Sequence, residues 1–263
     1  MLRTRILTAL IIAPLAVAAL YLLPASWFAV AYGLVAALGA YEWGGLIGLR
    51  RFWSRLAYAA LFVVAAGMTW WLDRGFGLAI VVGSIVWIVA AGLVLTYPAT
   101  AAVVREPWSN GLLGLFVLWG AWSAVVEVRG EPGSGGANWV MWLLVLVWSA
   151  DVGAYFAGRR FGRRKLAPAV SPGKTWEGAF GGMLVSLALC GGALLVLGLP
   201  AWWLLAVAGL VVVSIFGDLF ESVIKRVRGV KDSSNLLPGH GGILDRIDSL
   251  LAVLPVFALI LAR

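Results

Sequence analysis

Apolar runs, each about long enough to cross a bilayer as a helix, follow one another along almost the whole chain. A spanning helix needs roughly 20 mostly apolar residues. Of the 263 residues, 62% are hydrophobic and only 12% are charged, and a soluble core of this size cannot bury so much apolar side chain. The sequence therefore predicts an all-α polytopic membrane protein with about nine transmembrane helices. We place them at residues 6–23, 27–47, 56–72, 78–97, 112–126, 139–156, 178–199, 202–220 and 247–261.

Charge placement gives these helices a direction across the membrane. If the N-terminus is cytoplasmic, all but three of the 20 Lys and Arg residues fall on the cytoplasmic side, as the positive-inside rule expects. The three on the other side are Arg74, Arg129 and Arg263. An odd number of helices then puts the C-terminus outside. This bias accounts for the net charge of +8, so no nucleic acid is needed as a partner.

The chain carries no repeat of fixed period and no low-complexity linker, so we predict a single membrane domain over residues 1–263. Residues 1–138 are interpreted as scaffold helices. Residues 139–263 are expected to carry the functional site, because carboxylates collect there at the cytoplasmic ends of helices. The first apolar run is interpreted as a retained helix, since no cleavage pattern for a signal peptide follows it. The single cysteine, Cys190, excludes a disulfide within the chain.

The first group of candidate site residues ends the sixth predicted helix. Asp151, Tyr155 and Arg159 are spaced i, i+4 and i+8, which puts them on one face of a helix. A carboxylate in an apolar segment is a candidate for function, and Asp151 and Tyr155 are proposed to contact substrate. The alternative is a surface ion pair between Asp151 and Arg159.

A second group lies between a basic loop and the seventh predicted helix. The segment from Ser171 to Thr175 contains Gly-Lys-Thr, as a nucleotide-binding P-loop does, but Pro168 stands where that motif needs its first glycine. A P-loop is therefore rejected. Free N–H groups at a helix start, with Lys174 and two hydroxyls, still suit a phosphate, so Ser171, Lys174 and Thr175 are candidates for substrate binding. The alternative is an ordinary helix start with Pro172 in its first turn.

A third group spans the end of the eighth predicted helix and the start of the ninth. Asp218, Glu221 and Lys225 share one helix face at i, i+3 and i+7, and Asp245 and Asp248 begin the last helix. Carboxylate oxygens suit Mg²⁺, a cation that also coordinates substrate phosphates. The alternative is that these carboxylates only pair with nearby Lys and Arg. The metal candidates are Asp218, Asp245, Asp248 and Glu221.

A glycine pair comes just before the last helix. The backbone N–H groups of His240, Gly241 and Gly242 could meet an anion there, so all three are candidates for substrate binding. A lone histidine is as often a hydrogen-bonded structural residue as a ligand, and the role of His240 stays open.

The run from Ser222 to Asp248 resembles the signature of the phosphatidate cytidylyltransferases, also called CDP-diacylglycerol synthases. It holds S-x-x-K-R, K-D, P-x-H-G-G and D-R-x-D elements in that order, and the segments that begin at Asp151 and at Ser171 resemble two upstream blocks of that family. The resemblance implies transfer of the cytidylyl group of CTP to phosphatidic acid in phospholipid biosynthesis, giving CDP-diacylglycerol and pyrophosphate. It also implies Mg²⁺ or another divalent cation as cofactor.

The resemblance also implies roles for single residues. The residues assigned to catalysis are Lys225, Arg226, Asp218 and Asp245. Lys231 and Arg246, which lie in the signature, join the substrate-binding candidates. The implied partners are CTP, phosphatidic acid and the bilayer, and the implied location is the cytoplasmic membrane of a bacterium.

Two rival functions and the assembly state stay open at this point. A CTP-dependent lipid kinase would also need a nucleotide and an amphiphile at a membrane surface but would release CDP instead of pyrophosphate. A polytopic transporter would show polar residues near the membrane midplane, often in repeated halves, whereas here they gather at one face. Gly178 and Gly182 form a small-xxx-small pair that suits helix contact within the chain or in a homodimer.

Overall fold

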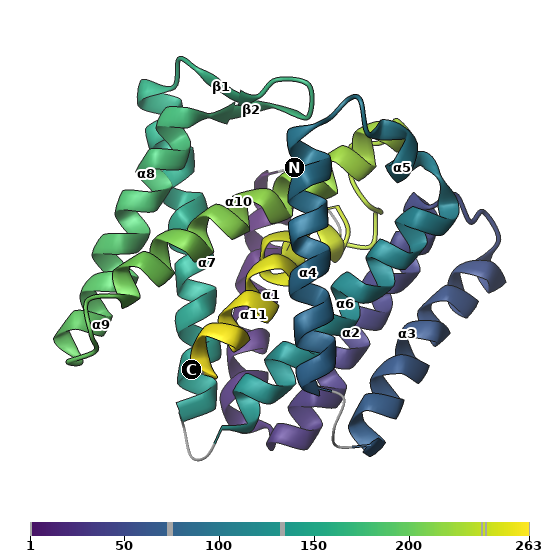
Figure 1. Ribbon diagram of the computed structural model, residues 1–263, viewed down its shortest axis with the longest axis horizontal. Helices are drawn as coiled ribbons and strands as arrows, with labels where there is room; N and C mark the ends of the chain where they lie inside the picture. Colours follow the sequence, from purple (N-terminus) through teal and green to yellow (C-terminus); the bar gives the residue numbers. More distant parts are fainter. Residues whose placement is uncertain (1, 73–75, 132–134, 238, 240, 263) are drawn as a thin grey trace.

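The computed structural model describes residues 2–72, 76–131, 135–237, 239 and 241–262 as a helical bundle with one small hairpin (Figure 1). In chain order the elements are α1 (Leu2–Leu22), α2 (Ala25–Leu46), α3 (Phe52–Leu72), α4 (Phe76–Leu95), α5 (Ala101–Arg105), α6 (Pro107–Gly130), α7 (Gly135–Phe161), β1 (Lys165–Ala167), β2 (Ser171–Thr175), α8 (Trp176–Ser186), the π-helix η1 (Leu187–Gly191), α9 (Gly192–Val196), α10 (Trp203–Arg228) and α11 (Leu244–Leu261).

Each of the nine predicted segments overlaps a helix, with α8, η1 and α9 forming one continuous rod. By length and apolarity, six helices of the described chain can cross a membrane, namely α3, α4, α6, α7, the α8–α9 rod and α10. The polytopic helical class is thus confirmed, and the count of nine spans stays a prediction. In the described part of α1 only Leu10–Leu22 is apolar helix, α2 contains Glu42, and α11 begins with three charged residues.

The hairpin is the one departure from an all-helical chain among the described residues. Strands β1 and β2 pair antiparallel, with Lys165 opposite Thr175, where the sequence analysis expected a loop. The backbone N–H groups of Arg163 and Arg164 donate to the Glu177 carboxylate in the first turn of α8. These bonds tie the strand to the helix start, and the hairpin lies across one end of the bundle (Figure 1).

Helices α7 and α8 pack closely because glycines remove the side chains between them. A Cβ atom at Gly182 would lie 2.5 Å from the Ala150 carbonyl oxygen, and one at Gly178 would lie 2.9 Å from that of Ala154. Real Cβ atoms do not approach so closely, so both positions require glycine. The small-xxx-small pair is therefore used for helix contact inside the chain.

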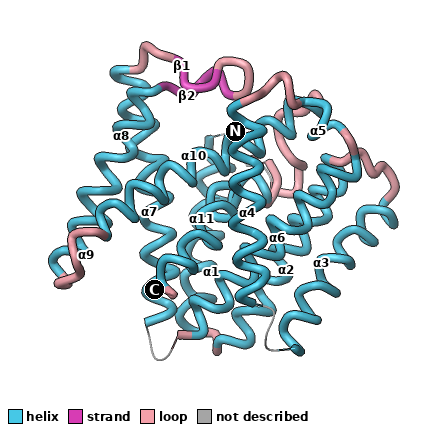
Figure 2. Tube along the Cα trace, in the orientation of Figure 1, coloured by secondary structure: helices cyan, strands magenta, loops and turns pink. Residues whose placement is uncertain are grey.

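Several basic loops meet at the end of the bundle that carries the hairpin. The Arg228 guanidinium, at the end of α10, donates to the carbonyl oxygens of Leu46 and Arg105. Figure 2 shows loops and the hairpin gathered at this end, while the C-terminus lies away from it. The end of α2, helix α5 and the end of α10 thus lie together at one end of the fold.

Candidate active site

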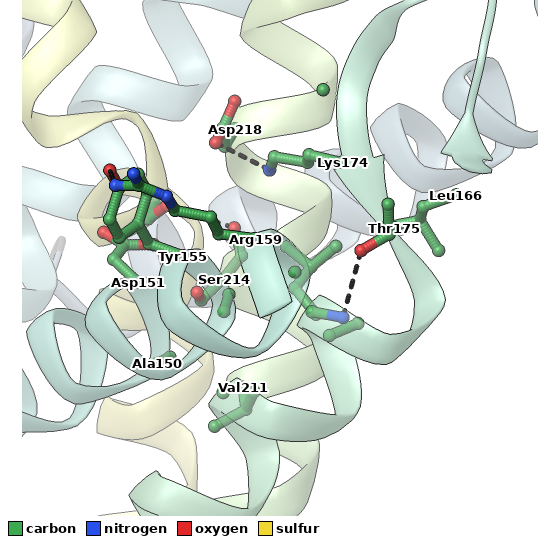
Figure 3. Close-up of a pocket in the computed structure, with 18 residues that line it drawn as sticks. Ala150, Asp151, Tyr155, Arg159, Leu166, Lys174, Thr175, Val211, Ser214 and Asp218 are labelled. Atoms are coloured by element: carbon green, nitrogen blue, oxygen red, sulfur yellow. Dashed lines mark hydrogen bonds and ion pairs between the residues drawn. The ribbon is translucent and has the colours of Figure 1, made fainter. Parts of the chain in front are cut away.

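A polar cavity of about 390 Å³ lies between α7, the hairpin, α8 and α10 (Figure 3). Its charged and hydroxyl-bearing lining includes Asp151, Tyr155 and Arg159 from α7, Lys174 and Thr175 from β2, Ser214 and Asp218 from α10, and Ser249 from α11. Members of all three groups that the sequence analysis singled out therefore line one space, although Asp218 is the one member of the third group in this lining.

Lys174 and Asp218 form an ion pair across this cavity. The Lys174 Nζ lies 2.6 Å from Asp218 Oδ2, and the two side chains are 27% and 32% exposed. Ser222, one turn further along α10, donates from its hydroxyl to Asp218 Oδ1 at 3.3 Å. The hairpin supplies the cation and α10 the carboxylate, so a positive charge is held where a substrate phosphate can enter.

The residues from α7 form another wall. Arg159 donates from Nη1 to the Tyr155 hydroxyl at 3.1 Å, and within the described chain it forms no ion pair with Asp151. The predicted alternative of a surface pair is therefore not what the structure has. Asp151 instead lies within electrostatic range of Lys174, Asp218 and Arg246.

A second, more buried charged cluster lies nearer the C-terminal end of α10. The Lys225 Nζ lies 2.8 Å from Glu221 Oε2 and 2.6 Å from Asp245 Oδ1, and all three side chains are at most 11% exposed. A buried charge is tolerated only when it is paired and hydrogen-bonded, and Lys225 pairs with one oxygen of each carboxylate. This pair joins the last turns of α10 to the first turn of α11.

Asp245 also organises the loop that precedes α11. Its Oδ2 accepts hydrogen bonds from the Ser233 backbone N–H, the Ser233 hydroxyl and the Gly242 backbone N–H, at 2.8–2.9 Å. Gly241 has φ +81°, and a Cβ atom there would lie 2.6 Å from Asp245 Oδ2, so the turn requires glycine. The anion that the Gly242 N–H meets is thus a carboxylate of the chain itself. His240 lies outside the described residues.

The carboxylates of this region suit a divalent cation by their charge and their surroundings. Asp248 interacts electrostatically with both Glu221 and Asp218, and Glu221 Oε1 is buried without a hydrogen-bond partner in the described structure. Asp218, Glu221, Asp245 and Asp248 bring four carboxylates close together, and in the described structure Lys174 pairs with Asp218 while Lys225 pairs with Glu221 and Asp245. No three acidic, His or Cys side chains of the described residues form a ready metal centre, but Mg²⁺ is usually held by one or two carboxylates together with substrate phosphates.

Of the remaining predicted site residues, two make contacts within the fold and three lie outside the cavity lining. Arg226 donates from Nε to the Val170 carbonyl oxygen at 3.1 Å, which anchors the hairpin to α10. The Thr175 hydroxyl accepts from the Gly178 N–H as the N-cap of α8, although Thr175 also lines the cavity. Ser171 begins β2 outside the lining, Lys231 is exposed in the loop after α10, and Arg246 is exposed on the first turn of α11.

One residue of this site was missed by the sequence analysis. Glu42 lies on α2, in the half interpreted as scaffold, and its buried carboxylate accepts hydrogen bonds from the loop before α11. The signal was available, because Glu42 is a carboxylate within an apolar run, the same rule that singled out Asp151.

A helical membrane fold with charged side chains around one cavity is compatible with an enzyme that acts on phosphate groups at a membrane surface, and the comparisons with known proteins identify its class. A family model described as the cytidylyltransferase family matches residues 3–263, so the chain belongs to that family. Two relatives carry the name phosphatidate cytidylyltransferase. The protein from Pseudomonas aeruginosa is 45% identical over 280 residues, covering 99% of this chain and 97% of the relative. The protein from Haemophilus influenzae is 38% identical over 286 residues, covering 98% of each chain. The family resemblance predicted from the signature is confirmed.

Proposed function

We propose that this chain transfers the cytidylyl group of CTP to phosphatidic acid, giving CDP-diacylglycerol and pyrophosphate. One observation carries the proposal beyond the names of the relatives. The polar cavity adjoins an apolar cavity of about 450 Å³, and both are lined by Leu166, Ala179 and Ile215. A polar space for phosphates beside an apolar space for an acyl chain suits a reaction between a nucleotide and a lipid.

The chemistry asks for charge neutralisation and positioning more than for a strong base. A phosphate oxygen of phosphatidic acid forms a bond to the α-phosphorus of CTP, and the bond from that phosphorus to the bridging oxygen of pyrophosphate breaks. The attacking phosphate is already an anion near neutral pH. Lys174 and Lys225 can neutralise charge that builds up in the transition state, and fixed cations in a site shielded from water do this well.

Mg²⁺, or another divalent cation, is the proposed cofactor. Asp218, Glu221, Asp245 and Asp248 would hold the ion, and the closeness of these carboxylates to one another supports this choice. When bound, such an ion neutralises the phosphates and stabilises the leaving pyrophosphate. Asp218→Asn and Asp245→Asn should each abolish turnover in a folded protein, because asparagine keeps the size of the side chain and loses its charge. A variant with near wild-type activity at ordinary Mg²⁺ would remove that residue from the metal site.

The function is tested with purified protein in detergent, phosphatidic acid, Mg²⁺ and CTP labelled at either the α- or the γ-phosphate. A cytidylyltransferase puts the α-label into lipid and releases the γ-label in pyrophosphate. A CTP-dependent lipid kinase would put the γ-label into lipid and release CDP. Lipid that carries the γ-label, or no labelled lipid at all, contradicts the proposal. The family match weighs against the transporter.

We further propose nine spans with the N-terminus in the cytoplasm and the C-terminus outside, in the cytoplasmic membrane of a bacterium. Support comes from the basic loops that meet at one end of the bundle through Arg228. A homodimer stays a prediction, and Gly178 and Gly182 do not add to it because they are used within the chain.

A further inference from the structure

Glu42 binds the start of α11 from a helix about 200 positions earlier in the chain. Its Oε1 accepts from the Ser234 hydroxyl at 2.6 Å and the Ile243 N–H at 2.9 Å. Its Oε2 accepts from the Ser233 hydroxyl at 3.0 Å and the Leu244 N–H at 2.9 Å. Each carboxylate oxygen thus holds one backbone N–H and one hydroxyl. Only 2% of the residue is exposed, so these bonds are shielded from water.

These contacts make Glu42 the cap of α11. The first N–H groups of a helix have no partner within it, and the N-cap residue of α11, Ile243, has no capping side chain of its own. The Glu42 carboxylate supplies the missing acceptors, and its negative charge faces the positive end of the helix dipole. The position and direction of the first turn of α11 therefore depend on α2.

The capped turn carries Asp245, which holds Lys225. The Ser233 hydroxyl lies within hydrogen-bond distance of both Glu42 Oε2 and Asp245 Oδ2, at 3.0 and 2.9 Å. Gly242 lies between the same groups, since a Cβ atom there would be 2.0 Å from the Ser233 hydroxyl and 2.5 Å from Glu42 Oε2. The Glu42 and Asp245 carboxylates therefore bind the same loop before α11, so a shift of Glu42 would move this loop and with it Asp245.

We propose that Glu42 is a positioning residue of the cytidylyl-transfer site, acting through Asp245 on Lys225. The inference rests on the proposed function. It assigns a role in the reaction to the first half of the chain, which contributes no residue to the cavity lining described above. Glu42 touches no reacting atom in this scheme. It fixes the direction in which the Lys225 ammonium points.

The test is Glu42→Gln, which keeps the shape of the side chain. Because each oxygen of Glu42 holds a backbone N–H, the amide nitrogen of glutamine must face one of these donors whichever way the amide is turned. We expect kcat to fall at least tenfold with a smaller change in the KM for CTP. Glu127→Gln, at an exposed glutamate on α6, is the matched control and should leave both constants unchanged.

A double-mutant cycle with Lys225→Ala separates positioning from a general loss of structure. If Glu42 acts through Lys225, adding Glu42→Gln to Lys225→Ala should lower kcat by less than threefold further. Independent effects would multiply, and a second tenfold loss in the double variant would overturn the proposal. All rates are measured per folded protein.

The proposal also depends on whether the Glu42 variants fold and on whether the wild-type protein is active. If Glu42→Gln does not fold, Glu42→Asp takes its place, since it keeps the charge with a shorter reach. If neither folds, Glu42 serves the fold alone and the proposal fails. Wild-type protein that makes no lipid product would instead contradict the proposed function, whereas an active wild type with an unaffected Glu42→Gln variant contradicts only this inference.

Discussion

Replacing Lys225 by methionine should lower both stability and turnover, and a second substitution separates the two losses. The Lys225 ammonium is the one cation within 2.8 Å of Glu221 and Asp245 in the described structure. Methionine keeps most of the side-chain length and removes the charge. Leaving a buried charge without its partner costs about 3–5 kcal/mol. We expect the lower end, about 3 kcal/mol, because Asp245 keeps its hydrogen bonds from Ser233 and Gly242 when Lys225 is lost.

The companion variant is Glu221→Gln with Lys225→Met. It removes the carboxylate that methionine leaves unpaired, while Asp245 keeps its hydrogen bonds from Ser233 and Gly242. Most of the lost stability should return. Turnover should stay at least about tenfold below that of Glu221→Gln alone, which corresponds to roughly 1.4 kcal/mol of transition-state stabilisation.

Thermal unfolding in detergent and CTP-dependent lipid formation, measured on the same preparations, give the two readouts. A Lys225→Met protein as stable as wild type would refute the reasoning on the buried pair. Recovery of turnover together with stability in the double variant would show that Lys225 serves the fold and not the reaction.

Three other predictions follow from the same structure. Lys174→Ala should lower turnover at least about tenfold, while Arg164→Ala, in a loop whose charge only attracts anionic lipid at about 1 kcal/mol per residue, should change it far less; equal losses would point to bulk surface charge. Met183→Trp should fill part of the apolar cavity and raise the KM for phosphatidic acid but not for CTP. An equal rise in both KM values would show that this cavity does not bind the lipid. Cysteines placed at Lys231 and Ala262 should react with an impermeant reagent from opposite sides of the membrane, and labelling from the same side would contradict the topology.

Hydrophobicity located the helices but not their ends. Helix α7 runs on through Arg159 and Arg160 to Phe161, although the predicted span ended at Phe156. Charged side chains at the end of a membrane helix do not terminate the helix. The conformation of the backbone sets where the helix ends. Helix α10 likewise continues through its basic residues until Gly229, whose φ of +70° gives the left-handed C-terminal cap.

The sequence also indicated which residues share a helix face, but not which partner each would meet. The spacing of Asp218, Glu221 and Lys225 is that of one face of α10, as predicted. Lys174 reaches Asp218 because the hairpin folds over the end of the bundle. The hydrophobicity pattern does not predict this placement of the hairpin. Arg226, to which the resemblance assigns a catalytic role, donates to the Val170 carbonyl oxygen, a contact that its place next to Lys225 on the same helix does not predict because adjacent helix positions face in different directions.

The glycine seam between α7 and α8 explains how a site for two charged substrates can form among apolar helices. Helix α8 begins directly after β2, so the place of its first turn sets the place of Lys174. Gly178 in that turn lies against Ala154, and Ala154 belongs to the α7 face that lines the cavity. A larger residue would push α8 outward and carry Lys174 away from Asp218. Close packing of two apolar helices thus holds the Lys174–Asp218 ion pair at 2.6 Å.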